Sequence, residues 1–266
     1  MLSKLFIIFI SLVLGSAFIL QTDKSFRTIV FKQKNCNVQI DDFGNAYIIS
    51  KMEILKYNAG GELIKSFSTK RYGSIDFVDV TNPLKILVYY KDFQQILFLD
   101  NQLTASSNMI SLEVLGLEQT SLVCTSANNS FWLYDKQNNS LQRFGEKSQQ
   151  LVKIDNLKRV LDIDIKPNFM KEKSNYLYLN CPNEGILVFD IYGSFLKTIP
   201  IKNISEFDIQ NNNVFYFQNK TLNEYSSQTF NTTKKVFNDS LLKTVYWQSD
   251  KFYKVFQDSL TKEIRK

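Results

Sequence analysis

The feature that most constrains this chain is a group of short apolar segments that returns about every 41 residues. The clearest copy is QIDDFGNAYIISKMEILKYNAGGELIKSF, Gln39 to Phe67, which has four apolar runs, with turns that contain Gly and Asn after the first and the third. Its third run, EILKY, has counterparts that end at Leu99, Phe144, Phe189, Tyr225 and Glu263. Short apolar runs between such turns are typical of β-strands. Four strands in a unit of this length predict the blade of a β-propeller.

The number of copies predicts a closed ring. The 266-residue chain holds six copies after its N-terminal segment, and the last copy ends after its third strand. We expect Arg27–Gln33 to supply the missing outer strand, because closure removes the sheet edges that an open array would expose. The segment 148–161 has helical spacing in places, but it lies where a fourth strand and its connection are needed. The predicted fold class is all-β, a single six-bladed β-propeller over residues 23–266 with four-stranded blades and a ring closed by an N-terminal strand.

The first strand of each unit carries a recurring pair, a hydrophobic residue followed by Asp. Four units have it, as Ile40-Asp41, Val78-Asp79, Ile163-Asp164 and Phe207-Asp208. In the third and sixth units the Asp position holds Cys124 and Tyr246. Each Asp precedes a turn, so we expect its carboxylate to accept backbone N–H groups; calcium binding is the alternative. With this register Lys166–Asn175 is an insertion in the first hairpin of the fourth unit, either a partner-contacting finger or a solvated loop.

The first copy resembles an NHL-type propeller repeat. It has the hydrophobic-Asp pair, a Gly-Asn turn, a strand containing Tyr, a strand ending in Tyr, and a Gly-containing turn before the last strand. The segment ILVFDIYGSFLKTI, Ile186 to Ile199, is similar to the second half of the same pattern. The resemblance implies an NHL-like six-bladed propeller of the exported, bacterial cell-envelope type. It implies little about chemistry, because this fold carries many functions.

The first 22 residues have the pattern of a secretory signal peptide. Lys4 precedes the apolar run Leu5–Leu14, and the small residues Gly15, Ser16 and Ala17 follow it. This order of charge, apolar core and small residues predicts export with cleavage after Ala17. The apolar run is shorter than the length that spans a bilayer. An uncleaved N-terminal membrane anchor is the alternative, and in either case we expect a periplasmic or cell-envelope-associated protein.

The composition excludes several kinds of catalytic and metal site. The chain contains no histidine, so Ser-His-Asp triads, Cys-His pairs and His-based zinc sites are excluded. Cys36, Cys124 and Cys181 are far apart and form no zinc motif; we expect buried thiols, and whether two of them are bonded stays open. The net charge of +6 comes from scattered lysines rather than a concentrated basic patch, which disfavours nucleic-acid binding. We expect no catalytic residue, no metal site and no cofactor.

The candidate binding residues are cations that a propeller would bring to one face. The turns between second and third strands share a face with the connections between blades. In this register the candidates are Lys51, Lys70, Arg71, Lys91, Lys158, Arg159 and Lys220, and Phe93 adds an aromatic ring at the tip of a turn. Asp92 and Asp155 offset them in part. A basic rim of this kind predicts an acidic partner, which could be a protein patch, an anionic glycan or lipid headgroups.

The sequence favours a binding protein over an enzyme. The preferred interpretation is a non-catalytic scaffold for protein–protein interaction in a bacterial cell envelope, because a propeller offers two broad loop faces and no catalytic signature is visible. One alternative is a module that binds a glycan or small ligand. The other is a lyase or hydrolase that works without histidine and relies on a carboxylate, Tyr or Lys as its base.

Overall fold

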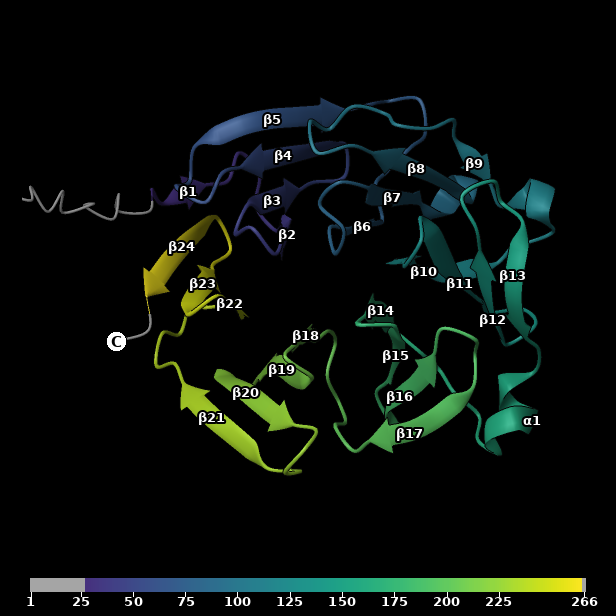
Figure 1. Ribbon diagram of the computed structural model, residues 1–266. Helices are drawn as coiled ribbons and strands as arrows, with labels where there is room; N and C mark the ends of the chain where they lie inside the picture. Colours follow the sequence, from purple (N-terminus) through teal and green to yellow (C-terminus); the bar gives the residue numbers. More distant parts are fainter. Residues whose placement is uncertain (1–26, 265–266) are drawn as a thin grey trace, which may run out of the picture.

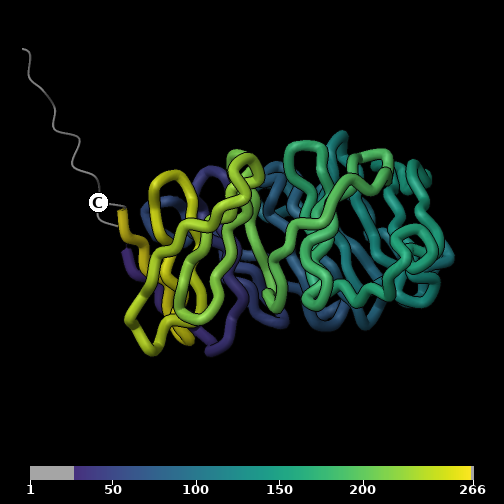
Figure 2. Tube along the Cα trace, turned by 90° about the horizontal axis from the view of Figure 1, so that it is seen from below, coloured from purple at the N-terminus to yellow at the C-terminus, as the bar shows by residue number. Residues whose placement is uncertain are grey.

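Six antiparallel four-stranded sheets are arranged around a central axis in the computed structural model, which describes residues 27–264 (Figure 1). Seen from the side, the sheets form a disc (Figure 2). Blade 1 contains β2 (Asn37–Ile40), β3 (Ala46–Ile49), β4 (Glu53–Tyr57) and β5 (Leu63–Ser68). Blade 2 contains β6 (Phe77–Asp79), β7 (Ile86–Tyr90), the 3₁₀ turn η1 (Lys91–Phe93), β8 (Gln95–Leu99) and β9 (Ile110–Ser111). The six-bladed propeller predicted from the repeat is confirmed.

Blades 3 to 6 repeat the same order of strands from the axis outward. Blade 3, after the 3₁₀ turn η2 (Glu113–Leu115), contains β10 (Thr120–Ser126), β11 (Ser130–Asp135), β12 (Ser140–Phe144) and β13 (Gln150–Ile154), and the helix α1 (Leu157–Leu161) follows it. Blade 4 contains β14 (Phe169–Lys173), β15 (Tyr176–Cys181), β16 (Gly185–Asp190) and β17 (Phe195–Ile199). Blade 5 contains β18 (Asp208–Gln210), β19 (Asn213–Gln218), β20 (Thr221–Ser226) and β21 (Thr232–Val236).

The sixth blade is built from both ends of the described chain. It contains β22 (Thr244–Gln248), β23 (Lys251–Val255) and β24 (Ser259–Ile264), and its outer strand is β1 (Ile29–Val30). Ile29 pairs with Leu260 in an antiparallel register, as the ring-closure hypothesis predicts. The same segment also contacts blade 1, because the Arg27 N–H donates to the Gly60 carbonyl at 3.0 Å. The N-terminal strand therefore joins the last blade to the first (Figure 1).

The core lies between neighbouring blades. All residues of β7 and β11 are buried, whereas β5 and β21 are largely exposed. Middle strands are covered by a blade on each side, so they read as continuous apolar runs rather than as an alternation. The outer strands lie at the rim of the disc, where most of the residues of β5 and β21 are exposed. This gradient explains why the third run of each unit can be traced in the sequence.

Tight turns connect the two strands of the first hairpin in blades 3 to 6. Each turn has two residues with positive φ: Asn128–Asn129, Ser174–Asn175, Asn211–Asn212 and Ser249–Asp250. Two-residue hairpins favour this conformation because its twist matches that of the flanking strands, and Asn tolerates it better than most residues. The abundance of Asn in this chain is thus explained in part by the turns.

The register predicted for blade 4 is wrong. Its first strand is β14, Phe169–Lys173, which pairs with β15 through a two-residue turn at Ser174–Asn175. The pair Ile163-Asp164 lies instead in the connection that follows α1. Segment 166–175 is therefore no insertion, because it contains the innermost strand β14 and the turn that follows it. The strand was missed because it buries Glu172 and places Lys171 against blade 5, so its charged residues hide the usual apolar pattern.

All three cysteines are free and buried, as expected for thiols that pack as small apolar side chains. Within residues 27–264, no helix has the length and apolar character needed to cross a bilayer. The predicted signal peptide, residues 1–22, lies outside the described part of the chain.

Candidate functional site

The two faces of the ring carry different loops. In every blade the turn between the second and third strands emerges on the same face as the connection to the next blade. We call this the mouth face. The first hairpin and the turn between the third and fourth strands emerge on the opposite face, which we call the hairpin face. Residues far apart in the sequence are brought together on each face because each blade contributes the same kinds of loop.

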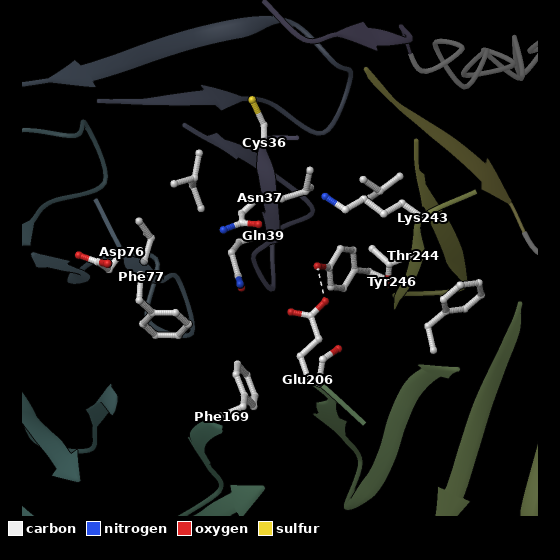
Figure 3. A pocket seen from close by; sticks show the side chains of 16 residues that line it. Cys36, Asn37, Gln39, Asp76, Phe77, Phe169, Glu206, Lys243, Thr244 and Tyr246 are labelled. Carbon is white, nitrogen blue, oxygen red and sulfur yellow. Dashed lines mark hydrogen bonds between the residues drawn. The ribbon is translucent and has the colours of Figure 1, made fainter. Parts of the chain in front are cut away.

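A cavity of about 310 Å³ opens at the centre of the mouth face, where the innermost strands begin (Figure 3). We call it the mouth pocket. Its polar lining comes from the inter-blade connections or first strands of four blades, and includes Asn37, Gln39, Asp76, Glu206, Lys243 and Tyr246. Its apolar wall includes Phe77 and Phe169, whose rings meet edge to face with centroids 6.2 Å apart. The volume lies at the low end of the range for small-ligand sites.

Glu206 and Tyr246 are a hydrogen-bonded pair of titratable side chains in the mouth pocket. The Tyr246 hydroxyl donates to Glu206 Oε1 at 2.9 Å (Figure 3). Burial is the main cause that raises the pKa of Glu206, although the Tyr246 hydrogen bond and the Lys171 charge act in the opposite direction. Burial and the nearby Glu206 charge raise the pKa of Tyr246. The Glu206 carboxyl and the Tyr246 hydroxyl therefore both keep their protons to a higher pH than exposed groups of the same kind.

A second polar cluster lies along the channel toward the hairpin face. The Lys171 ammonium is 2.5 Å from Asp208 Oδ1, which joins blades 4 and 5. Burial opposes ionisation of Asp208, but the Lys171 charge and hydrogen bond outweigh it and lower the pKa of this carboxyl. Lys173 reaches Asp42 Oδ2 at 2.6 Å. Blades 4 and 1 stand opposite each other in a six-membered ring, so this ion pair crosses the channel on the hairpin-face side.

The recurring Asp residues have three different roles. Asp41 caps its turn as predicted, and it accepts the backbone N–H groups of Phe43 and Asn45, each at 2.9 Å. Asp79 accepts the Thr81 N–H at 2.8 Å and also binds the Thr125 hydroxyl of blade 3 at 2.8 Å.

The other two members of the pattern do not cap a first hairpin: Asp208 pairs with Lys171, and Asp164 lies in an inter-blade connection. Among the described residues, no group of three or more Asp, Glu or Cys side chains is gathered as a metal site.

The predicted binding cations are exposed, and the strand topology places their turns and connections on the mouth face: Lys51, Lys70, Arg71, Lys91, Lys158, Arg159 and Lys220. The Lys220 ammonium already donates hydrogen bonds within the protein, to the Ser240 carbonyl at 3.1 Å and to the Leu242 carbonyl. Phe93 is 50% exposed, and one edge of its ring lies over Gly73. A Cβ at Gly73 would be 2.7 Å from that ring, so Phe93 is held in place while much of it remains open.

The mouth face carries more carboxylates than the two noted from the sequence. Around blades 2 to 4 its cations are Lys91, Lys136, Lys158, Arg159 and Lys166, and its carboxylates are Asp92, Glu113, Glu118, Asp155, Asp162, Asp164 and Glu184. The connections into blades 5, 6, 1 and 2, with the turns of blades 5, 6 and 1, form a second region that we call the basic half. Its cations are Lys32, Lys34, Lys51, Lys70, Arg71, Lys202, Lys220 and Lys243, and its carboxylates are Asp76, Glu206, Asp239 and Asp258. The face is therefore divided by charge rather than uniformly basic.

Sequence reasoning missed the mouth pocket as a unit. Tyr246 was identified only as a residue standing in the Asp position, and Glu206 precedes a recognised pair without belonging to it. Neither residue carries a motif, because the site is made by one or two residues from each of several blades. The available signal was positional: residues just before the first strand of each unit converge on the channel mouth.

Comparisons with known proteins identify the fold and no closer relationship. No protein-family model matches the sequence, and no curated protein matches it. Solved structures match at low identity. A catalytically inactive histidine-to-alanine form of virginiamycin B lyase from Staphylococcus aureus, with quinupristin, has a TM-score of 0.58 at 12% identity, covering 87% of this chain and 80% of that one.

Two further matches come from other settings. BBS1N in complex with ARL6DN has a TM-score of 0.54 at 9% identity, covering 86% of this chain and 77% of that chain. The Neurospora crassa Pan2 WD40 domain has a TM-score of 0.55 at 9% identity, covering 84% of this chain and 76% of that chain. The chain is a β-propeller. At these identities the likeness shows the fold alone, and the NHL-type family remains a prediction.

Proposed function

We propose that this protein is a non-catalytic β-propeller scaffold of a bacterial cell envelope, and that it holds an acidic protein partner on its mouth face. The observation that carries the proposal is the basic half, in which exposed cations outnumber carboxylates around one side of the channel mouth. Phe93 adjoins this region, because its ring rests on Gly73 in the same connection as Lys70 and Arg71. An aromatic side chain beside an arginine is a combination that is enriched at protein interfaces.

Other apolar side chains on the mouth face support the same interpretation. Met52, Val114, Val160 and Leu241 are exposed there in addition to Phe93. They are spread over turns and connections of several blades, so they suit a broad partner surface better than a single deep pocket. The cations would steer an acidic partner toward this face, and the apolar groups would hold it after contact.

The envelope location rests on the N-terminal segment. Residues 1–22 have the order of charge, apolar core and small residues that directs export, and the alternative of an uncleaved anchor would also place the propeller outside the cytoplasm. Mass spectrometry of the N-terminus of the exported protein distinguishes the two, because a cleaved chain begins near residue 18 and an anchored chain begins at Met1.

Charge reversal tests the proposed face. Lys70→Glu with Arg71→Glu removes cations from the basic half, whereas Lys158→Glu with Arg159→Glu changes the same number of charges in the other half. We expect the first pair to weaken partner capture from intact envelopes about tenfold or more, and the second pair to weaken it less. Both variants should melt within about 1–2 °C of the parent, because exposed charges contribute little to folding.

Partner capture should also decrease as salt is added, since exposed charges are screened at physiological ionic strength. A partner that stays bound to the Lys70→Glu, Arg71→Glu variant at unchanged strength contradicts docking on the basic half. A partner lost equally from both variants would assign docking to the whole mouth face instead.

A second candidate function is small-ligand binding or histidine-free chemistry in the mouth pocket. The raised pKa of Glu206 and its hydrogen bond to Tyr246 are the observations that favour it. The lyase to which this fold is similar is inactive in a histidine-to-alanine form, and this chain contains no histidine. Any chemistry here would therefore fall to Glu206, Tyr246 or Lys243. Glu206→Gln separates the two functions, because it should abolish pocket chemistry and leave partner capture on the basic half unchanged.

A further inference from the structure

A second polar cavity lies on the hairpin face, away from the mouth pocket. It has a volume of about 330 Å³ and opens between the first hairpins of blades 2, 3 and 4. We call it the hairpin pocket. Most of its lining residues carry a hydroxyl or an amide: Thr81, Asn82, Thr125, Ser126, Asn128, Asn129, Ser174 and Asn175. The others are Ala127, Glu172 and Lys173. A lining of neutral donors and acceptors is suited to a ligand that carries many hydroxyl groups and no charge.

The two charged residues of this pocket are already paired with protein groups. Glu172 is buried, and its carboxylate accepts the Trp132 indole N–H at 2.6 Å, the Ala127 N–H at 2.8 Å and the Ser126 hydroxyl at 2.5 Å. The Lys173 ammonium is engaged by Asp42 at 2.6 Å. An anion would meet the Glu172 carboxylate, and a metal ion would have to displace its three donors. Neither kind of ligand fits the pocket as well as a neutral one.

The base of the pocket is rigid. The buried Arg143 guanidinium donates to the Ser126 hydroxyl at 2.7 Å and to the Ala127 carbonyl at 3.0 Å. These bonds and those to Glu172 fix the start of the blade 3 hairpin from two sides. A site whose groups are held before binding loses less entropy when a ligand enters.

The rim of the pocket presents amides that the fold does not use. Asn128 and Asn175 occupy positive-φ positions of the blade 3 and blade 4 turns, at 57° and 65°. Within residues 27–264, the side chains of Asn128, Asn175 and Ser174 make no hydrogen bond to protein groups. The turn conformation explains why Asn stands there, but it leaves each amide free to bind. Two free amides that line the same polar pocket can bind hydroxyls of a pyranose ring, because each amide offers N–H donors and a carbonyl acceptor.

We propose that the hairpin pocket is a binding site for a neutral carbohydrate, contacted by the Asn128 and Asn175 amides above a floor of Ser126 and Glu172. The site goes beyond the scaffold function, because it lies on the opposite face from the basic half. An occupied hairpin pocket leaves the mouth face free, so one molecule can hold a glycan and a protein partner together.

Tryptophan fluorescence provides the test, because the Trp132 indole is bonded to the pocket floor. The chain has two tryptophans, and Trp247→Phe leaves Trp132 as the single reporter. In this background the probes are N-acetylglucosamine, its β-1,4-linked disaccharide, glucose and maltose at up to about 10 mM, which covers the millimolar affinity usual for a few hydrogen bonds. Glucose 6-phosphate serves as the anionic probe. Asn128→Gly with Asn175→Gly removes both amides, and glycine retains the positive-φ turns.

The matched control is Asn211→Gly with Asn212→Gly, which makes the same change in the same type of turn of blade 5. We expect a saturable fluorescence change with at least one neutral sugar, weakened about tenfold or more by the Asn128 and Asn175 changes and preserved in the control. The proposal is overturned if no neutral sugar gives a saturable change, if only the phosphosugar binds, or if the two double variants bind equally well. Unchanged melting temperatures in both variants show that the comparison reports on binding.

Discussion

Glu206 is the residue whose ionisation should be most visible in the stability of the protein. Its ordinary pKa is 4.5, and burial raises it in the folded state. A carboxyl with a raised folded pKa binds its proton more tightly in the folded chain than in the unfolded chain. The folded state therefore loses stability as the pH rises from below 4.5 through the raised pKa, and is unaffected by this group at lower pH.

Glu206→Gln tests this dependence. The variant has no ionisable group here, so it should be more stable than the parent at pH 8, and this advantage should disappear as the pH falls below 4.5. A tenfold difference in proton affinity between the folded and unfolded chains corresponds to about 1.4 kcal/mol, which is about 3–6 °C in melting temperature for a domain of this size. Thermal unfolding of both proteins between pH 4 and pH 8 gives the result. An advantage of the variant that is the same at every pH would contradict a raised pKa for Glu206.

At the scale of elements, closure of the ring depends on one of its two shortest strands. Strand β1 has only two residues, yet it completes blade 6. Ile29 is 2% exposed and packs with residues of blades 1 and 6, whereas Val30 next to it is 69% exposed. The two side chains point to opposite sides of the same strand. Ile29 and Val30 are therefore a matched pair of positions for measuring how much ring closure contributes to the free energy of unfolding.

Ile29→Ala should destabilise the protein by about 2–4 kcal/mol, because it removes a buried side chain at the junction of the ring. Val30→Ala should change the free energy of unfolding by less than about 0.5 kcal/mol, since the side chain is already in water. Denaturant unfolding of both variants gives the comparison. Equal small effects would mean that the ring is held by its other blades and that β1 contributes little to closure.

The sequence predicted these elements unevenly, for physical reasons. Middle strands such as β7 and β11 are apolar on both faces and therefore stand out in the sequence. Strand β14 was misplaced because its charged residues bind partners in other blades: Lys171 pairs with Asp208 in blade 5, and Glu172 accepts the Trp132 indole N–H in blade 3. No local sequence pattern reveals such contacts. The mouth pocket was missed for a related reason: Asn37, Glu206 and Tyr246 come from three connections or strand starts far apart in the chain.

At the scale of the whole molecule, the ring separates two kinds of surface. The mouth face carries the basic half and the mouth pocket with Glu206. Both faces expose apolar side chains, such as Phe93 on the mouth face and Phe43 on the hairpin face. The hairpin face carries tight Asn-rich turns and the hairpin pocket. The ion pair between Lys173 and Asp42 crosses the channel at the hairpin face. The two proposed binding sites therefore lie on opposite faces, so a protein partner and a carbohydrate would not compete for the same surface.

The measurement that most directly tests the proposed function is site-specific photocrosslinking in intact envelopes. A photoreactive phenylalanine analogue replaces Phe93, which is 50% exposed on the mouth face, or Phe43, which is 69% exposed in a first hairpin on the hairpin face. We predict a crosslinked protein partner from position 93 that is lost when Lys70 and Arg71 are changed to Glu, and no such product from position 43. A partner crosslinked from position 43 alone, or from neither position, would contradict a scaffold that docks its partner on the mouth face.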